Sequence, residues 1–182
     1  LLTNKEIIVF EQLLLGNKNY LTKNAYSGDI SAVRRNGTSV NGQHPKAVVI
    51  TCSDSRVVPE IIFNAGIGEI FVIRCAGNVM DDTILGSIEY AVEHLHSDLV
   101  MVLGHSCCGA VTSTIKSTPK GFTKRITDKI KEVIKEESDI EKAVKINALA
   151  QVQIIKNLLK FENSVSVCAA VYNIETGEVI VL

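Results

Sequence analysis

The sequence contains no tryptophan and has almost no excess of charge of either sign. Its 19 lysine and arginine residues stand against 20 aspartate and glutamate residues, which leaves a formal net charge of −1. This balance gives no electrostatic reason to expect a nucleic acid or an anionic membrane surface as a partner. The absence of tryptophan excludes binding modes built on tryptophan stacking. The longest apolar runs, such as residues 99–103, are far shorter than the ~20 residues that cross a bilayer, so no membrane partner is expected either.

The chain also lacks internal repeats, low-complexity segments and linkers rich in proline or glycine. Its 182 residues compare with ~150 residues for an average domain, so we expect a single domain over residues 1–182. Hydrophobic residues make up 46% of the chain and charged residues 21%. These values are typical of a folded globular domain and argue against disorder.

Cysteine occurs five times, an odd number that does not suggest a scaffold of disulfide bonds. We expect no signal peptide, because Lys5 and Glu6 interrupt the apolar N-terminal stretch and no cleavage site of small residues follows. Together these features predict a reducing, cytoplasmic compartment, in which thiols are free to bind a metal. The cysteines are Cys52, Cys75, Cys107, Cys108 and Cys168.

Short apolar runs rich in β-branched residues alternate with helical patterns along the chain. Such runs are typical of strands that are buried on both faces of a parallel sheet. They lie at residues 47–51, 70–73, 99–103 and 165–171. A short final strand is expected at residues 178–182, antiparallel to the strand before it because only a tight turn separates the two. The sequence therefore predicts an α/β fold with a mostly parallel central sheet of four strands, a short antiparallel edge strand and flanking helices.

The N-terminal helix is expected at about residues 4–16, after a capping box formed by Thr3 and Glu6. Its apolar stripe consists of Ile7, Phe10, Leu14 and Leu15. Because this stripe needs an apolar surface, we expect the helix to pack on a partner subunit. Residues 17–46 are polar and contain glycine, which predicts mostly loop with at most a short helix. Further amphipathic patterns predict helices at residues 83–94, around residues 126–134 and at residues 140–159.

Metal-ligating side chains follow two of the expected strands. Cys52 comes directly after the first strand, and His105 and Cys108 come after the third. Open α/β sheets bind ligands at the carboxyl ends of their strands, so the three side chains converge if these two strands are neighbours. Two cysteines, one histidine and a free fourth position make up the ligand set of a catalytic zinc site. Spacing alone leaves a second interpretation open, in which a buried cysteine and an unrelated H-x-x-C turn stand apart.

The motifs Cys-Ser-Asp-Ser-Arg at residues 52–56 and His-x-x-Cys-Gly at residues 105–109 resemble those of the β-class carbonic anhydrases. The resemblance covers about residues 4–182. Further matching segments are residues 43–47, 59–63, 68–74, 76–78 and 86–92. The resemblance implies one zinc ion per chain and the reversible hydration of carbon dioxide to bicarbonate and a proton, by attack of a zinc-bound hydroxide. It also implies self-association as a homodimer or tetramer.

By position in these motifs, Cys52, His105 and Cys108 resemble the zinc ligands of the family. Asp54 and Arg56 resemble its catalytic pair. An ionised Asp54 only accepts hydrogen bonds, so it can orient the hydroxide, and Arg56 can hold it bidentately and keep it ionised. Without Arg56, the carboxylate of Asp54 could swing onto the zinc ion. The alternative interpretation of Asp54 is a helix N-cap.

Carbon dioxide is small and apolar, so its pocket should be mostly hydrophobic. The residues that resemble the pocket of the family are Gln43, Phe71, Ala76, Tyr90 and Gly109. Gly109 offers a backbone N–H near the substrate, and in the family part of this lining crosses from a partner subunit. The alternative interpretation makes Phe71, Ala76 and Tyr90 ordinary core residues and Gln43 a solvated one.

Several positions depart from the family pattern or remain open. Cys75 stands where many members have asparagine, and Cys107 adjoins Cys108 as either an oxidisable or an inert thiol. Some members have a regulatory bicarbonate site that uses tryptophan, and this chain cannot build that site in the same way, so Arg74 is expected to be structural at a subunit interface. The alternative functions are hydrolysis of CS2 or COS by the same site, and a non-catalytic, zinc-bound scaffold or redox-responsive protein. The pair Asp54–Arg56 argues against the scaffold, because a purely structural zinc site does not need it.

Overall fold

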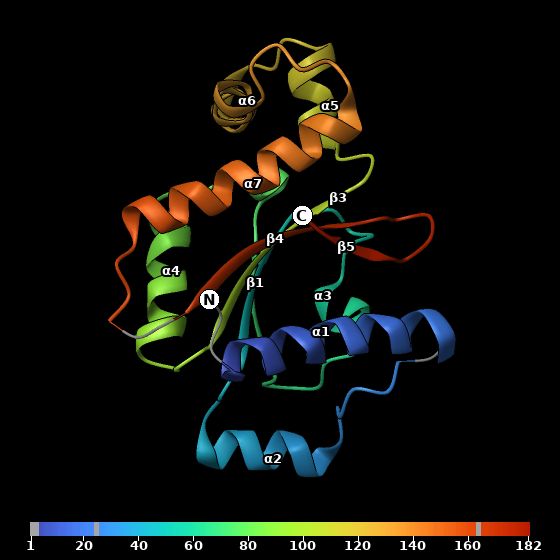
Figure 1. Cartoon of the computed structure of the whole chain (residues 1–182), viewed down its shortest axis with the longest axis vertical. Coiled ribbons are helices and arrows are strands. Elements are labelled where there is room, and N and C mark those ends of the chain that lie inside the picture. Colours follow the sequence, from blue (N-terminus) through green and yellow to red (C-terminus); the bar gives the residue numbers. More distant parts are fainter. Residues whose placement is uncertain (1–3, 24–25, 163–164) are drawn as a thin grey trace.

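A computed structural model shows the fold of the chain and describes residues 4–23, 26–162 and 165–182 (Figure 1). Five strands form one sheet in the order β2-β1-β3-β4-β5. The strands are β1 (Ala47–Thr51), β2 (Ile70–Arg74), β3 (Leu99–His105), β4 (Ser166–Tyr172) and β5 (Val179–Val181). The first four run parallel, and β5 pairs antiparallel with β4. The predicted fold, a mostly parallel sheet with an antiparallel edge strand and flanking helices, is confirmed.

Helices cover both faces of the sheet (Figure 1). They are α1 (Asn4–Lys23), α2 (Ala32–Asn41), α3 (Pro59–Ile62), the 3-10 turn η1 (Ala76–Asn78), α4 (Asp82–Glu93), α5 (Gly109–Lys116), α6 (Gly121–Ile134) and α7 (Ile140–Leu158). One face of the sheet, with Val49 and Met101, packs in the same core as α1 and α3. The other face, with Val48 and Val100, packs in the same core as α4 and α7. Because neighbouring residues of a strand point to opposite faces, burial of both faces explains the unbroken apolar runs in the sequence.

A third core lies at the carboxyl edge of the parallel strands, where α5, α6 and α7 meet (Figure 1). It contains Cys52 and Cys108 together with Ile130 of α6 and Val144 of α7. Strand order places β1 between β2 and β3, with Thr51 opposite Leu103. The segment after β1 therefore starts beside the end of β3. This neighbourhood of strands is what the predicted meeting of Cys52, His105 and Cys108 requires.

The N-terminal helix is longer than predicted, ending at Lys23 rather than near residue 16. Its buried apolar side chains are Val9 and Leu13, which pack on the sheet of their own chain, whereas Ile7 and Leu15 of the predicted stripe are 38% and 57% exposed. Only Phe10 and Leu14 of the predicted stripe pack against this core, and both are partly buried. Packing on a partner subunit stays a prediction, now for the face that exposes Ile8 and Leu15. The capping residue predicted at Thr3 lies outside the described residues.

The structure contains a short helix in residues 17–46, namely α2, but the prediction of loop for most of this range is wrong, because residues 17–23 at the end of α1 are helical as well. Neither segment shows an apolar stripe. Asn17 ties α1 to α3 and to the turn between β4 and β5, because its side-chain amide donates to the carbonyls of Ile62 and Gly177. Helix α2 buries none of its residues and begins at Ser31, whose hydroxyl accepts the Arg34 N–H at 3.1 Å. Within the described residues, no helix is both long and apolar enough to cross a membrane.

Candidate metal centre

Cys52, His105 and Cys108 come together at the carboxyl edge of the sheet. Cys52 directly follows β1, His105 is the last residue of β3, and Cys108 is the N-cap of α5. Their potential ligand atoms all lie within 4.8 Å of one another, and all three residues are buried. The convergence that the sequence made conditional on neighbouring strands is therefore present, and the interpretation in which the residues stand apart is wrong.

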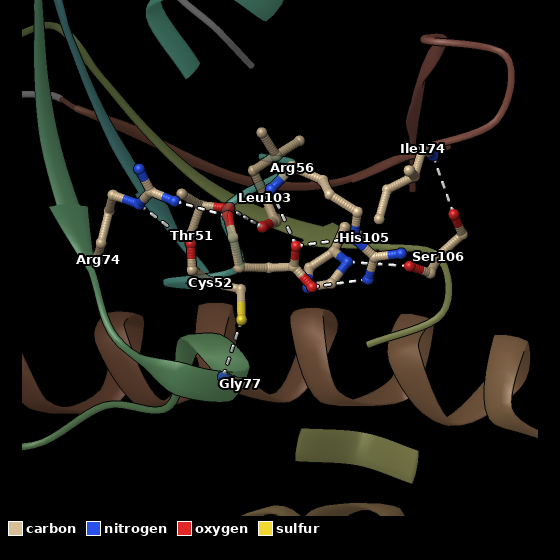
Figure 2. A network of polar contacts seen from close by, with 10 residues as sticks. Thr51, Cys52, Arg56, Arg74, Gly77, Leu103, His105, Ser106 and Ile174 are labelled. Atoms are coloured by element: carbon tan, nitrogen blue, oxygen red, sulfur yellow. Dashed lines mark hydrogen bonds and ion pairs between the residues drawn. The ribbon is translucent and has the colours of Figure 1, made fainter. Parts of the chain in front are cut away.

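The two nitrogens of the His105 ring differ in their hydrogen bonding, and Figure 2 shows the ring between Ser106 and the loop after β1. Its Nδ1 lies 2.9 Å from the carbonyl oxygen of Ser106, which makes Nδ1 the protonated nitrogen. The Nε2 atom has no hydrogen-bond partner among the described residues, although it is buried. A buried lone pair without a partner is costly in a folded protein, and a metal ion satisfies it.

The thiols of Cys52 and Cys108 shift each other's pKa in opposite directions. A hydrogen bond from the Cys108 thiol lowers the pKa of Cys52 to about 4, and contacts with His105 and the Gly77 N–H act in the same direction. The pKa of Cys108 is raised by its hydrogen bond to Cys52 and by burial, while N–H groups of Val111 and Ala110 at the start of α5 partly offset this effect. Two soft sulfurs and one imidazole lone pair, at this separation, fit a zinc ion.

Asp54 lies at the edge of the cluster and is held by Arg56. The Arg56 Nε and Nη2 atoms donate to the two carboxylate oxygens at 2.9 and 2.8 Å, and the Arg56 N–H donates to Oδ1 at 3.0 Å. These bonds hold the pKa of Asp54 well below its usual range, so the carboxylate is ionised. The Oδ2 atom stands 4.0 Å from His105 Nε2. Asp54 does not cap a helix, because α3 begins later, with Val58 as its N-cap.

Arg74 and Gly77 support the cluster, and the sequence analysis did not identify either of them as site residues. Arg74 ends β2 opposite Thr51, and its guanidinium donates to the carbonyl oxygens of Cys52 and Asp54 at 3.2 and 2.7 Å (Figure 2). It therefore holds the loop that carries both residues. The Gly77 N–H donates to Cys52 Sγ at 3.3 Å. Of these two residues, the sequence could have indicated only Arg74. It ends an expected strand, and the last residue of a strand that neighbours β1 lies beside Cys52.

The predicted pocket residues are divided between two regions of the chain. Ala76 and Gly109 adjoin the cluster, because one precedes Gly77 and the other follows Cys108. Phe71 pairs with Val48, well before Cys52 along β1, and its ring centroid lies 6.4 Å from that of Tyr90 on α4.

Gln43 lies away from the cluster, on the other side of β1. It precedes β1 and is exposed, in a shallow hollow that also contains Arg35, Ser39 and Gly68. Since Cys52 follows β1 and Gln43 precedes it, the two lie at opposite edges of the sheet. The chain therefore brings together the predicted metal ligands and the pair Asp54–Arg56, but it does not bring Gln43 to them.

All five cysteines are free thiols in the structure. Burial raises the pKa of Cys75 to about 11, and its thiol donates to the carbonyl of Val79 at 3.2 Å. Cys107 is exposed and adopts a left-handed backbone conformation with φ of 55°. This conformation turns the chain between His105 and Cys108, so that both can face the same point.

Comparison with known proteins gives one consistent result. A family model described as carbonic anhydrase matches residues 47–179. Carbonic anhydrase 2 of Mycobacterium tuberculosis is 43% identical over 109 residues, which cover 60% of this chain and 52% of that protein. The chain thus spans about half the length of this curated relative.

Two solved structures share the fold. A β-carbonic anhydrase from Coccomyxa, in complex with acetazolamide, superimposes with a TM-score of 0.70 at 31% identity, covering 82% of this chain and 79% of that one. A tetrameric β-carbonic anhydrase from Sordaria macrospora superimposes with a TM-score of 0.71 at 23% identity, covering 96% and 97%, and this likeness concerns the fold alone.

The fold and the site define a class of protein: an α/β domain with a buried Cys–His–Cys centre at the carboxyl edge of a parallel sheet. The family match and the Coccomyxa structure make the assignment specific. The chain belongs to the β-class carbonic anhydrase family.

Proposed function

We propose that the chain catalyses the reversible hydration of carbon dioxide to bicarbonate and a proton, with one zinc ion held by Cys52, His105 and Cys108. The observation that carries this proposal is the buried cluster of three donors, with its unpartnered His105 Nε2 beside the ionised pair Asp54–Arg56. Three protein ligands leave a fourth position for water, which distinguishes a catalytic zinc site from a structural one.

When bound, zinc supplies a Lewis acid that lowers the pKa of a coordinated water and so provides a nucleophile near neutral pH. The residues of the chain then direct this nucleophile. Asp54 accepts a hydrogen bond from the attacking water, because an ionised carboxylate has no proton to donate. Arg56 keeps Asp54 ionised and engages both of its carboxylate oxygens, so that neither would be free to bind the metal. The released proton passes to buffer.

The substrate pocket, in this proposal, is completed by a second copy of the chain. Ala76 and the Gly109 N–H line it from the chain that holds the metal, whereas Gln43, Phe71 and Tyr90 lie away from the cluster of their own chain. We propose that the partner copy supplies part of this lining, in a homodimer or tetramer. The tetrameric Sordaria relative supports such an assembly. Because all five cysteines are free thiols, we also propose a reducing, cytoplasmic location.

Stopped-flow measurement of carbon dioxide hydration tests the proposal. Zinc-loaded protein should catalyse hydration, chelator-treated protein should not, and added zinc should restore the rate. Cys108→Ser should lower both zinc content and rate, whereas Cys168→Ser, which changes a thiol in β4 outside the cluster, should keep both. One zinc per chain without hydration would favour the non-catalytic scaffold or redox-responsive protein. Parallel assays with CS2 and COS would reveal hydrolysis of those gases by the same site.

A further inference from the structure

The turn that follows β2 is built to bring one backbone N–H against the sulfur of Cys52. Gly77 lies in this turn with φ of 71°, a left-handed conformation that favours glycine. Its N–H donates to Cys52 Sγ at 3.3 Å in a buried position. A Cβ atom at Gly77 would stand 2.7 Å from Ile130 Cδ1 and 3.0 Å from Ala110 Cβ. The close approach of this turn to the cluster therefore needs a residue without a side chain.

Two buried side-chain amides of α7 hold the same turn from the other side. The Asn147 Nδ2 atom donates to the carbonyl oxygen of Gly77 at 2.9 Å. Gln151, one helical turn later, donates from Nε2 to Asn147 Oδ1 at 3.0 Å. The Oε1 atom of Gln151 accepts the N–H of Met80 at 2.9 Å. The segment from Gly77 to Met80 is thus fastened at both ends to a chain of two connected amides.

These amides occupy a face of α7 that is otherwise apolar. Asn147 and Gln151 are each only 1% exposed, between Val144, Ala148 and Val152. Burying an amide is costly unless its hydrogen bonds are made, so the pair stabilises one position of the turn and penalises others. The N–H and the carbonyl of Gly77 belong to adjacent peptide units that meet at its Cα. Rotation of the carbonyl away from Asn147 would therefore also redirect the N–H that Cys52 receives.

We propose that Asn147 and Gln151 are positioning residues of the metal centre, which act through Gly77 to orient the Cys52 sulfur and to set its strength as a ligand. The inference rests on the proposed function in one respect, namely that Cys52 binds the metal. Groups outside the ligand shell that hydrogen-bond the ligands typically change metal affinity by about 10- to 100-fold when they are lost. Asn147 contacts Gly77 directly and Gln151 contacts it through Asn147, so the first should have the larger effect.

The test uses the full chain loaded with cobalt or zinc and compares three variants. Asn147→Leu removes the bond to Gly77, and Gln151→Met removes the second amide at similar volume. Asn17→Leu is the matched control, because Asn17 is also a buried amide, bonded to the backbone of Ile62, Gly177 and Val179, none of which bonds to the cluster. The readouts are the sulfur-to-cobalt charge-transfer band in the near ultraviolet and the rate at which zinc is released to a chelator.

We expect Asn147→Leu to shift the cobalt band and to speed zinc release by about 10- to 100-fold, with a smaller change of the same sign in Gln151→Met. Asn17→Leu should lower stability but leave both readouts at the wild-type values. If Asn147→Leu does not fold, Gln151→Met decides the question alone. Folded variants with the wild-type band and release rate would overturn the inference, as would an equal change in Asn17→Leu. Wild-type protein that binds neither metal would overturn the proposed function with it.

Discussion

Arg56 binds both carboxylate oxygens of Asp54 from a position only two residues along the chain. Its Nε and Nη2 atoms donate at 2.9 and 2.8 Å, and its backbone N–H gives Oδ1 a further bond at 3.0 Å. Three donors on one carboxylate fix its plane as well as its charge. This arrangement keeps Asp54 beside His105, with 4.0 Å between Oδ2 and Nε2, while both of its oxygens are engaged elsewhere.

Replacing Arg56 by alanine should therefore reduce turnover without removing the metal. We expect a loss of at least about 100-fold in carbon dioxide hydration, the lower range for a group that orients a reacting proton. Zinc content should stay at one ion per chain, because Arg56 is not among the three clustered donors. Arg125→Ala is the control, since Arg125 stacks on Phe122 in α6, 4.7 Å from the ring centroid. Near-normal turnover of Arg56→Ala would exclude the role given to this pair.

The sequence predicted the sheet well because each parallel strand is buried on both faces. The runs at β1 and β3 are largely apolar and every residue in them is buried. Strands of this kind are typical of a parallel sheet that helices cover on both faces. The ligands could be located for the same reason, since Cys52 and His105 come at the ends of such strands. What the sequence left open was whether β1 and β3 are neighbours, a property of the whole topology rather than of either run.

The features that sequence analysis missed depend on contacts between distant residues or on exposed helices. The bond from Asn147 to the Gly77 carbonyl spans 70 residues, and no local pattern marks it. Helix α2 could not be detected by an apolar stripe, because it buries none of its side chains. The predicted stripe of α1 was inaccurate, because Ile7 and Leu15 are exposed and the helix instead buries Val9 and Leu13.

A pair of glycine substitutions tests the packing of the turn beneath Cys52. Gly77→Ala should lower the free energy of unfolding by about 2–4 kcal/mol, because it combines a strained left-handed backbone with a Cβ that meets Ile130 and Ala110. Gly86→Ala should raise it by about 0.5–1 kcal/mol, since Gly86 lies within α4 and its Cβ would point into open space. Urea unfolding measures both values, and equal stability of the two variants would contradict this packing.

The stability of the protein should fall at alkaline pH through Cys168 in β4. Burial raises the pKa of this thiol to about 11, from an ordinary value of 9.0. Between pH 9 and pH 11 the unfolded chain loses this proton first, so the free energy of unfolding decreases as pH rises. Cys168→Ala has no thiol to titrate. The difference in free energy of unfolding between the wild type and this variant should therefore shrink by about 2 kcal/mol over that range. Urea unfolding measures this difference, and a difference that does not change with pH would refute the role given to Cys168.

Self-association is expected because several apolar side chains remain exposed and Gln43 lies away from its own cluster. Val33 and Val40 of α2 are 83% and 76% exposed. Light scattering under native conditions should return two or four times the single-chain mass of 19.8 kDa. Val33→Asp, on the exposed face of α2, tests whether this helix lies in the interface and should shift the mass towards the single chain. A wild-type mass equal to that of one chain would rule out the completed pocket.

The most direct test is X-ray absorption at the zinc edge of the purified, zinc-loaded chain. We expect one zinc ion per chain with two sulfur neighbours and one imidazole nitrogen, in agreement with the cluster of Cys52, His105 and Cys108. A zinc ion with four sulfur neighbours, one without any sulfur neighbour, or a folded chain that takes up no zinc would contradict this centre and the reaction assigned to it.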